Sequence, residues 1–404
     1  MLVTLILLTV TGYAAAILFL RRGVYNVDKD NQSLRGGGSL PLPEPNGATP
    51  SFSVIIAARN EEHNIAACLQ TVFAQNISNN QYEVIVIDDR SNDTTLSILR
   101  ELSNHHPNLK VITITEIPAG ISPKKHAVST GIKSAANDII VFTDADCRVQ
   151  PQWLSTIGKY FNNDDNIALV QGIASYSRPP GMSKIFWGLQ SIDFLSHVIT
   201  AAAAIGADLP INSSANNMAF RKSVFEEIGG YGDDGTVSFG DDDLILQRIW
   251  KHKKASHADG PRTRKIRFMA DPCASVETAP TETVRAVFEQ RSRWGSATVH
   301  YGPFQIALLS IIFAFYLTIP LTAIASIFDM SFLSICASLI LIKLCGECVL
   351  MIPGTRICGK ENLRKYIIPA SLIQLPIVLA AVLFGVFGKL KWKGQVLSHQ
   401  VKTS

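Results

Sequence analysis

The sequence predicts an α/β domain with a mainly parallel sheet, flanked by apolar segments long enough to cross a membrane. In the central part of the chain, short runs of β-branched residues alternate with helical patterns, which is typical of a parallel sheet covered by helices on both faces. Both ends carry long apolar stretches. One hydrophobic core rarely grows beyond about 250 to 300 residues, so a chain of 404 residues should contain more than this domain.

The first apolar segment lies at the N-terminus. Leu2 to Leu20 contains no charged residue and is long enough for a helix to cross a hydrocarbon core of about 30 Å. Nothing basic precedes it, and Arg21 and Arg22 follow directly, which is the reverse of the charge order in a cleaved secretory signal. We therefore expect a retained transmembrane anchor over residues 1–22 and, from the positive-inside rule, a cytoplasmic domain behind it.

The next segment is rich in Gly, Ser, Pro and Asn, and we interpret residues 23–50 as a linker. The α/β domain is expected over residues 51–298. Its predicted strands cover residues 52–58, 82–87, 108–114 and 138–143, with a helix over about 125–136. Ligands of parallel sheets bind beyond the carboxyl ends of the strands, so the residues at those ends are candidates for a functional site.

The predicted C-terminal membrane region, residues 303–390, contains three apolar stretches, at about 304–328, 331–352 and 366–388. Each approaches the roughly 20 residues that a spanning helix needs. If all three cross, the basic tail at residues 391–404 falls on the outer side, against the positive-inside rule. Pro369 and Pro376 could instead make the last stretch re-entrant or interfacial. The sequence leaves both topologies open.

Charge and cysteine content exclude other classes of protein. The formal net charge is +4 and no basic stripe carries interleaved aromatic residues, so nucleic acid is not an expected partner. The seven scattered cysteines do not form a disulfide framework, which fits a reducing compartment. A basic run between Lys251 and Arg267 has two interpretations, a solvated loop and a patch on anionic lipid headgroups. The apolar run over residues 194–205 is either a buried or interfacial helix or a lipid contact.

Acidic residues follow two of the expected strands. Asp88 and Asp89 come after the strand at 82–87, and Asp144 and Asp146 follow the strand at 138–143. Two carboxylates separated by one residue can hold a hard cation, and Mg²⁺ or Mn²⁺ is usually bound by one or two carboxylates plus substrate phosphates. Such a pair of aspartates is a weak signal alone, because Asp is common in loops.

Three consecutive carboxylates, Asp241, Asp242 and Asp243, precede a helical run. Helix capping explains one of them well and three poorly, because crowded like charges raise the pKa of each carboxyl. A carboxylate with a raised pKa is what a general base for a hydroxyl group requires.

Further along, Gln290, Arg293 and Trp294 lie near the end of an amphipathic pattern and would share one helix face. Arg293 could contact a phosphate and Trp294 could form an apolar wall for a sugar ring or base. The alternative is a helix end whose basic residues complement the helix dipole.

Together these motifs resemble the D, DxD, D, QxxRW signature of family 2 glycosyltransferases. The resemblance covers about 240 residues, and four motifs in this order are jointly more specific than any one of them. Two further segments also stand where the family has nucleotide-binding residues, Arg59-Asn60-Glu61-Glu62 and Lys124-Lys125. The resemblance implies a GT-A fold, a Rossmann-like arrangement, plus transmembrane helices.

The resemblance also implies roles for these positions. Asp146, assisted by Asp144, would hold the divalent metal, Mg²⁺ or Mn²⁺, and Asp242 or its neighbour Asp241 would be the catalytic base. The nucleotide sugar would contact Arg59, Asn60, Glu61, Asp88, Asp89, Lys124, Lys125, Asp144, Gln290, Arg293 and Trp294.

The implied reaction is an inverting, metal-dependent transfer of a hexose from a nucleotide sugar, with a UDP-sugar as the expected donor. The small membrane portion is similar to that of ceramide-glucosyltransferase-like and carotenoid-glycosyltransferase-like members, which favours a lipid-like membrane acceptor. Two alternatives stay open, a processive polysaccharide synthase and a non-catalytic sugar-nucleotide-binding membrane subunit. We expect an integral protein of the cell (inner) membrane with a cytoplasmic catalytic domain.

Overall fold

The computed structural model describes residues 2–36, 50–118, 120–232, 240–255, 264–295, 301–387, 390–392 and 395–397. The chain divides into two compact units. The first contains residues 1–29, 178–211 and 280–396, and the second contains residues 30–177, 212–279 and 397–404. This division differs from the single α/β domain expected over residues 51–298, because two stretches of that range belong to the first unit.

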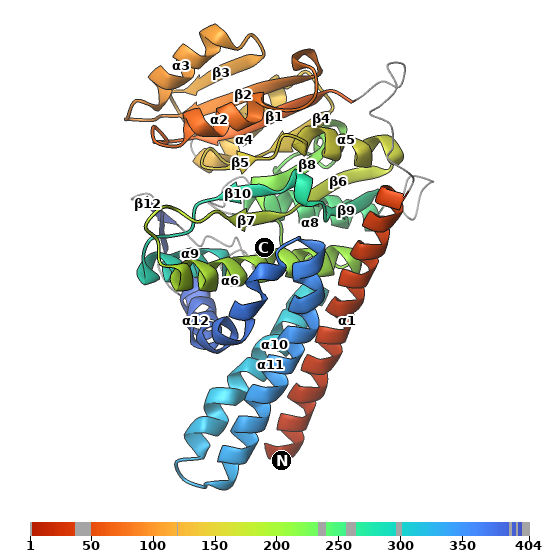
Figure 1. The fold of residues 1–404 in the computed structure, drawn as a ribbon, viewed down its shortest axis with the longest axis vertical. Coiled ribbons are helices and arrows are strands. Elements are labelled where there is room, and N and C mark those ends of the chain that lie inside the picture. The colour runs from red at the N-terminus through yellow and green to blue at the C-terminus, as the bar shows by residue number, and fades with distance from the viewer. Residues whose placement is uncertain are drawn as a thin grey trace. The chain divides into compact units, whose positions relative to one another are not determined.

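A seven-stranded sheet forms the centre of the second unit, in the order β3-β2-β1-β4-β8-β6-β9 (Figure 1). The strands are β1 (Phe52–Ala58), β2 (Tyr82–Asp89), β3 (Leu109–Ile114), β4 (Ile139–Phe142), β6 (Ile167–Gly172), β8 (Met218–Arg221) and β9 (Lys265–Met269). Only β8 runs antiparallel to its neighbours, and the other pairings in this order are parallel. The predicted mainly parallel sheet is confirmed.

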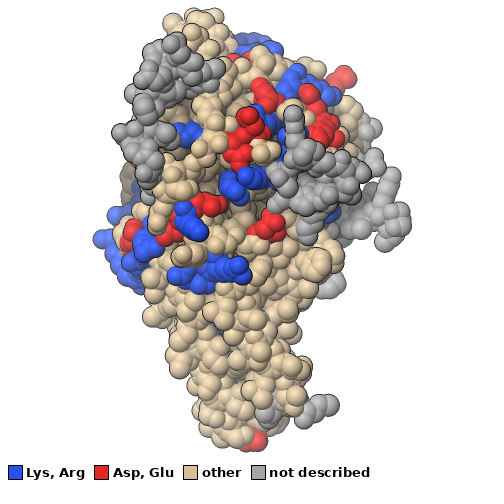
Figure 2. Space-filling view, turned by 90° about the vertical axis from the view of Figure 1, so that its right-hand side faces the viewer, with Lys and Arg blue, Asp and Glu red and all other residues tan. Residues whose placement is uncertain are grey.

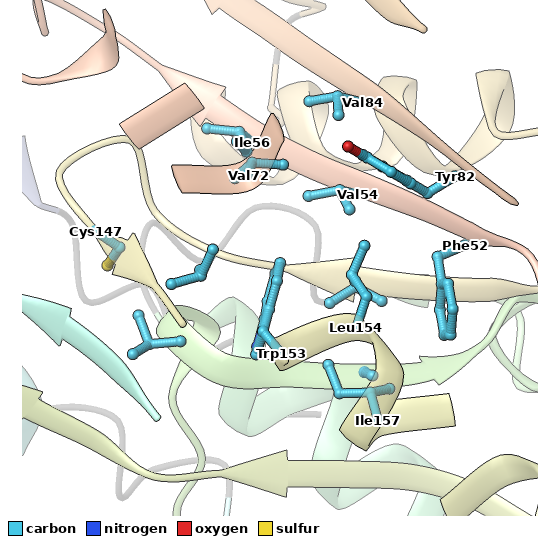
Figure 3. Packing of buried hydrophobic residues seen from close by; sticks show 14 of the residues in the cluster. Phe52, Val54, Ile56, Val72, Tyr82, Val84, Cys147, Trp153, Leu154 and Ile157 are labelled. Atoms are coloured by element: carbon cyan, nitrogen blue, oxygen red, sulfur yellow. The ribbon is translucent and has the colours of Figure 1, made fainter. Parts of the chain in front are cut away.

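Helices cover both faces of this sheet. Successive side chains of its central strands point to opposite faces, and both faces are buried. Val54 and Ile56 of β1 share one buried cluster with Trp153 and Leu154 of α5 (Figure 3). On the opposite face, Gly131 of α4 lies so close to the sheet that a Cβ there would be 2.8 Å from Ile55. The helices of this unit are α2 (Ile65–Phe73), α3 (Thr95–His105), α4 (Pro123–Ser134), α5 (Trp153–Asn163), α7 (Lys222–Glu227) and α8 (Asp241–Ala255).

A second sheet of the same unit has three short strands in the order β5-β10-β7. They are β5 (Arg148–Val149), β10 (Val276–Thr278) and β7 (Ala174–Tyr176). Asn217 ties this region to the main sheet. Its side-chain amide donates to the carbonyl oxygens of Ile173 at 2.9 Å and Ala274 at 2.8 Å, and its oxygen accepts from the Trp153 indole at 2.9 Å.

The first unit consists mainly of long helices. In Figure 1, α1 (Leu2–Gly36), α10 (Pro303–Ala325) and α11 (Ser331–Ile357) lie side by side. Their contact includes Tyr13, whose ring stacks on Phe315 with centroids 4.1 Å apart. The unit also contains α6 (Lys184–Gly206), α9 (Val284–Gly295), α12 (Ile367–Phe387) and the short strands β11 (Leu390–Trp392) and β12 (Gln395–Leu397).

Five helices of the described part are long and apolar enough to cross a membrane: residues 4–34, 184–206, 303–325, 331–357 and 361–381. Three of them match the predicted C-terminal stretches and one matches the predicted anchor. The face of the long helices that Figure 2 shows, with α1 toward the viewer, is almost free of charged side chains. The fifth helix, α6, contains the apolar run at 194–205, and its most apolar window is 72% buried within the protein.

The first helix extends beyond the anchor expected over residues 1–22. It continues to Gly36, so the first part of the expected linker is helical. The reason is that polar residues there find partners: Asn26 donates to the carbonyl oxygen of Gly206 at 2.9 Å, and Asp28 pairs with Arg356 at 2.8 Å. Residues 37–49 of the expected linker lie outside the described residues, as do 256–263 of the basic run and most of the basic tail.

Candidate active site

The acidic residues predicted from two separate motifs converge on one lysine. Lys124 lies in the first turn of α4, which begins at Pro123. Its ammonium nitrogen is 3.7 Å from a carboxylate oxygen of Asp144, which follows β4, and 3.5 Å from one of Asp241, which begins α8. Burial lowers the pKa of Lys124, but the negative charges of Asp241, Asp144 and Asp242 outweigh it, so the pKa is raised above its ordinary value.

The candidate metal ligands lie in the turn after β4. One ligand atom each from Asp144, Asp146 and Cys147 fall within 4.8 Å of one another. The Thr278 hydroxyl of β10 donates to Asp146 at 3.2 Å and fixes that carboxylate. Burial, followed by the charges of Asp144 and Glu61, raises the pKa of Asp146. A group of carboxylates that disfavour each other's ionisation is the donor set that a hard divalent cation stabilises.

Cys147 contributes differently from the two aspartates. It is buried, and burial together with the charges of Asp146 and Asp144 raises the pKa of its thiol well above the usual value. The sulfur accepts from the Asn216 side chain at 3.0 Å and contacts a carboxylate oxygen of Asp146 at 3.6 Å. The protonated thiol therefore supports Asp146, and oxygen ligands for a cation come from the carboxylates.

The three consecutive aspartates have different partners. Asp242 accepts hydrogen bonds from the backbone N–H of Ala215 at 2.9 Å and of Asp243 at 3.0 Å, and Asp243 accepts from the N–H of Ser213. Burial, together with the charge of Asp241, raises the pKa of Asp242 to about 6, although Lys124 opposes the rise. Among the three, Asp241 is paired with Lys124 and Asp243 holds a neighbouring loop. Asp242 therefore has the properties of a general base.

Asp88 and Asp89 occupy the end of β2, as the sequence predicts, but their surroundings differ. Asp89 pairs with Arg90 at 2.9 Å and more distantly with Arg59 at 3.9 Å. Asp88 is buried, and one of its carboxylate oxygens has no hydrogen-bond partner among the described residues. A buried, unpartnered carboxylate oxygen is costly, and a ligand N–H donor would satisfy it.

The segment after β1 joins two loops. The side-chain oxygen of Asn60 accepts from the N–H of Asn92 at 2.8 Å, and Glu62 accepts from the hydroxyl of Thr94 at 2.7 Å. Asn60 has a φ of 54°, which is the left-handed region that Asn tolerates better than most residues. Glu61 directs its carboxylate to the Asn64 side chain at 2.9 Å. The segment therefore shapes the strand ends through its loop contacts.

The two predicted lysines have separate roles in the structure. Lys124 meets the carboxylates, whereas the side chain of Lys125 is buried and lies over the Tyr231 ring, 5.6 Å from its centroid. Tyr231 is also buried, and burial together with Asp241 and Asp242 raises the pKa of its hydroxyl well above the usual value.

The last motif belongs to the first unit. Gln290, Arg293 and Trp294 lie on α9, confirming the helix expected there. The Trp294 ring contacts two aromatic residues of α6, with centroid distances of 5.8 Å to Phe194 and 5.1 Å to His197.

The family follows from comparison with known proteins. Residues 53–229, which contain β1, the residue pair Asp88-Asp89, Lys124 and the DxD turn, match the model of glycosyl transferase family 2. This part of the chain is a family 2 glycosyl transferase domain.

Relatives of this family 2 domain include enzymes that are named after a glycolipid. The β-monoglucosyldiacylglycerol synthase of Synechocystis sp. is 32% identical over 254 residues, which is 61% of this chain and 47% of that protein. The protein of the same name from Trichormus variabilis is 27% identical over 254 residues, 62% of this chain and 49% of that one. Glycosyltransferase AglE of Haloferax volcanii is 33% identical over 132 residues, 33% of this chain and 42% of that one. The chain thus spans about half the length of these relatives.

Among solved structures, a mannosyltransferase from Pyrobaculum calidifontis in complex with GDP-Man and Mn²⁺ superposes with a TM-score of 0.51. The two sequences are 17% identical, and the match covers 93% of this chain and 99% of that chain. This likeness confirms the predicted GT-A fold.

Some residues of the candidate site carry no signal in the sequence. Thr278 is 132 residues from Asp146 in sequence, and Tyr231 stands outside the recognised motifs. The backbone N–H of Ala215 carries no side-chain signal at all. Asn216 and Asn217 do carry a signal in the sequence. Two adjacent amides before a buried strand indicate polar contacts in the protein interior, because buried polar groups are normally hydrogen-bonded.

Proposed function

We propose that this chain transfers a sugar from a nucleotide sugar to a hydroxyl of a lipid-like membrane acceptor, with inversion at the anomeric carbon. The observation that carries the proposal is the convergence of Asp144 and Asp241 on Lys124, at 3.7 and 3.5 Å. It joins the end of β4, the start of α4 and the start of α8 in one charged cluster. A cluster with perturbed pKa values at the carboxyl ends of parallel strands is typical of a catalytic site.

Asp144 and Asp146 are the residues that would hold a divalent cation, and Asp88 would accept from the nucleotide base. When bound, Mg²⁺ or Mn²⁺ neutralises charge on a departing diphosphate. Lys124 adds a fixed positive charge beside the same carboxylates. The mannosyltransferase with the similar fold was solved with Mn²⁺ and GDP-Man, which supports a metal and a nucleotide sugar here.

Asp242 is the proposed base. Its carboxylate is oriented by two backbone N–H groups and its pKa is raised to about 6, so it is ionised at neutral pH and basic enough to accept a proton. The acceptor oxygen bonds to the anomeric carbon as the bond from that carbon to the diphosphate oxygen breaks, and the acceptor proton moves to Asp242. Attack from the face opposite the diphosphate inverts the configuration.

Two observations support a lipid-like acceptor. Relatives matched over 61% and 62% of this chain are named β-monoglucosyldiacylglycerol synthases, and the chain has five helices apolar enough to cross a membrane. A processive synthase is the second candidate, because a poly-β-1,6-N-acetyl-D-glucosamine synthase of Staphylococcus epidermidis is 23% identical over 60% of this chain and 53% of that protein.

The test is a screen of nucleotide sugars, UDP-sugars first, against membrane lipid extract, with mass spectrometry of the product. We expect one lipid to gain one hexose in the presence of Mn²⁺ or Mg²⁺, and Asp146→Asn to remove the reaction. Asp165→Asn is the matched control, because Asp165 is fully exposed. Polymer made from one nucleotide sugar would favour the processive alternative. Full turnover by both variants would contradict the site.

We also propose that the catalytic residues face the cytoplasm. Besides Arg21 and Arg22 at the anchor, the last turn of α11 and the connection to α12 together carry four basic residues, whereas the α10–α11 turn at 326–330 has Asp329 and no Lys or Arg. The four are Arg356 in α11 and Lys360, Arg364 and Lys365 in the connection. The positive-inside rule then assigns the α11–α12 connection to the cytoplasmic side.

Cysteine labelling tests this orientation. We expect Lys360→Cys to react from the cytoplasmic side and Met330→Cys from the outer side. If α12 is re-entrant, Gln395→Cys reacts from the same side as Lys360→Cys. Labelling of Lys360→Cys only from the outer side would reverse the proposed orientation.

A further inference from the structure

The motif on α9 contains a buried charge that the family signature does not use. The signature names Gln290, Arg293 and Trp294, but the arginine between them, Arg291, is the buried one. Arg291 is 6% exposed, and the side chain of its carboxylate partner Asp193 on α6 is 18% exposed. A charge withdrawn from water in this way is costly unless it is paired and hydrogen-bonded, so its contacts indicate what holds it there.

Arg291 and Asp193 form an ion pair with one hydrogen bond. The Nε atom of Arg291 donates to Oδ2 of Asp193 at 2.7 Å, and Nη2 lies 2.6 Å from the same oxygen without the geometry of a second hydrogen bond. The other carboxylate oxygen, Oδ1, accepts from the Gln374 side chain of α12 at 3.1 Å. One carboxylate on α6 is therefore bonded to both α9 and α12, and these three helices belong to the same unit.

The same guanidinium orders two of the signature residues. Its Nη1 atom donates to the side-chain oxygen of Gln290 at 2.8 Å. Its plane lies over the Trp294 ring, with Cζ 4.1 Å from the centroid, and that ring also meets Phe194 and His197 of α6. A planar guanidinium can donate to Asp193 and to Gln290 from separate nitrogens while it stacks on the Trp294 ring, which a lysine ammonium cannot.

We infer that Arg291, through Asp193 and Gln374, is the positioning residue that sets the rotation of α9 and thereby the orientation of Gln290 and Trp294 for the transfer reaction. The inference rests on the proposed function for its catalytic consequence. Its structural basis is independent of that function, because every contact involved lies within the first unit. Arg291 is not assigned a contact with substrate.

The experiment compares two conservative arginine substitutions on the same helix. Arg291→Lys keeps the charge but removes the stacking on Trp294 and the separate donors to Asp193 and Gln290. Arg285→Lys is the matched control, because Arg285 is 88% exposed and pairs at 2.8 Å with Glu289 one turn along α9. We expect kcat to fall about 10- to 100-fold in Arg291→Lys, since small misplacements of positioning groups have effects of this size. Donor KM should change much less, and Arg285→Lys should match the wild type.

Asp193→Asn tests the same contact from α6 and should reproduce the fall in kcat. Asp193→Arg combined with Arg291→Asp restores the pair in reverse and should recover part of the activity lost in either single variant. Unchanged kcat in both Arg291→Lys and Asp193→Asn would overturn the inference, as would equal losses in Arg285→Lys.

Hydrogen exchange of the intact protein in detergent separates this inference from the proposed function. We expect faster amide exchange over residues 284–295 in Arg291→Lys, with residues 303–325 unchanged. If the wild type transfers no sugar, the proposed function fails, and faster exchange of α9 still supports the docking contact. Exchange over 284–295 identical to the wild type would overturn it.

Discussion

Two charged clusters of this protein are built from similar residues and differ in what they leave unsatisfied. In the second unit, Lys124 lies between Asp144 and Asp241 at 3.7 and 3.5 Å, and a buried oxygen of Asp88 has no hydrogen-bond partner in the described part of the chain. In the first unit, Arg291 and Asp193 meet at 2.6 Å, and Gln374 takes the remaining carboxylate oxygen. The first arrangement has unused acceptors and perturbed protonation, which suits ligand binding. The second uses its acceptors internally, which suits positioning.

A third charged cluster lies among the apolar helices of the first unit. As in the Arg291–Asp193 pair, its carboxylate accepts hydrogen bonds from within the protein. Lys343 donates to Glu347 at 2.6 Å and to the Ser371 hydroxyl at 2.7 Å, and Tyr316 donates to the same Glu347 oxygen at 2.6 Å. Lys343 and Glu347 stand one helical turn apart on α11 and neutralise each other. The pair joins α10, α11 and α12. Charges in such segments persist only when they are paired.

The largest effect on activity is expected in the acidic cluster of the second unit, which contains the proposed base. Asp242→Asn removes the proposed base and keeps the shape of the side chain, although one of the two backbone N–H groups loses its acceptor, so kcat should fall about 10²- to 10⁴-fold. Steady-state transfer assays would measure this, with donor binding followed separately. A variant that retains more than a third of the wild-type kcat would move the base to another residue.

A large effect on stability is expected in the cluster around Lys343 and Glu347. These residues are assigned no direct role in the reaction. Lys343→Met leaves Glu347 without a cation, although the Tyr316 hydroxyl still donates to it, and breaking a buried ion pair in this way costs about 3 to 5 kcal/mol. Thermal unfolding in detergent should show a lower Tm. Combining it with Glu347→Gln removes the unpaired charge, and Tm should recover. A single variant as stable as the wild type would show that the pair is not buried in the membrane region.

In contrast to the Lys343–Glu347 pair, the ionised carboxylate of Asp242 should lower the stability of the folded protein. Because folding raises the pKa of Asp242 from 3.8 to about 6, the carboxyl favours folding fully below about pH 4, and that contribution is lost as pH rises through 6. The Tm of Asp242→Asn relative to the wild type should therefore be higher at pH 8 than at pH 4, by an amount corresponding to roughly 1 to 3 kcal/mol. The hydrogen bond that the asparagine loses is lost at both pH values and cancels in this comparison. A Tm difference that does not change between pH 4 and pH 8 would contradict the raised pKa.

The smallest effect concerns the lysine between the carboxylates. Lys124 lowers the pKa of Asp242, so Lys124→Met should move the acidic limb of the kcat/KM profile from near pH 6 upward, by about one unit. The limb appears because activity is lost as Asp242 becomes protonated. Profiles of the wild type and the variant, measured at saturating metal, would show the shift. A limb that stays in place would separate Lys124 from the base.

The sequence predicted what local patterns encode. The strands, the DxD turn and the acidic start of α8 each lie within a few residues, so alternation and residue type were enough to identify them. Arg291 and Asp193 are 98 residues apart, and no local pattern marks either as the other's partner. The same holds for the membership of α6 in the helical unit, because an apolar helix inside an α/β range is equally compatible with a soluble core.

The crossing of α1 and α6 has a consequence for how this protein can be handled. At Gly23 an added Cβ would lie 1.8 Å from the carbonyl oxygen of Ala203, and at Gly206 it would lie 2.1 Å from the carbonyl oxygen of Gly23. The two backbones touch with no side chain between them. The N-terminal helix is thus a structural neighbour of a mid-chain helix, and deleting it to obtain a shorter protein would expose the small-residue face of α6. Larger residues at Gly23 or Gly206 would disturb this backbone contact. Such variants would therefore test whether the crossing matters during biogenesis, when α1 is synthesised long before α6.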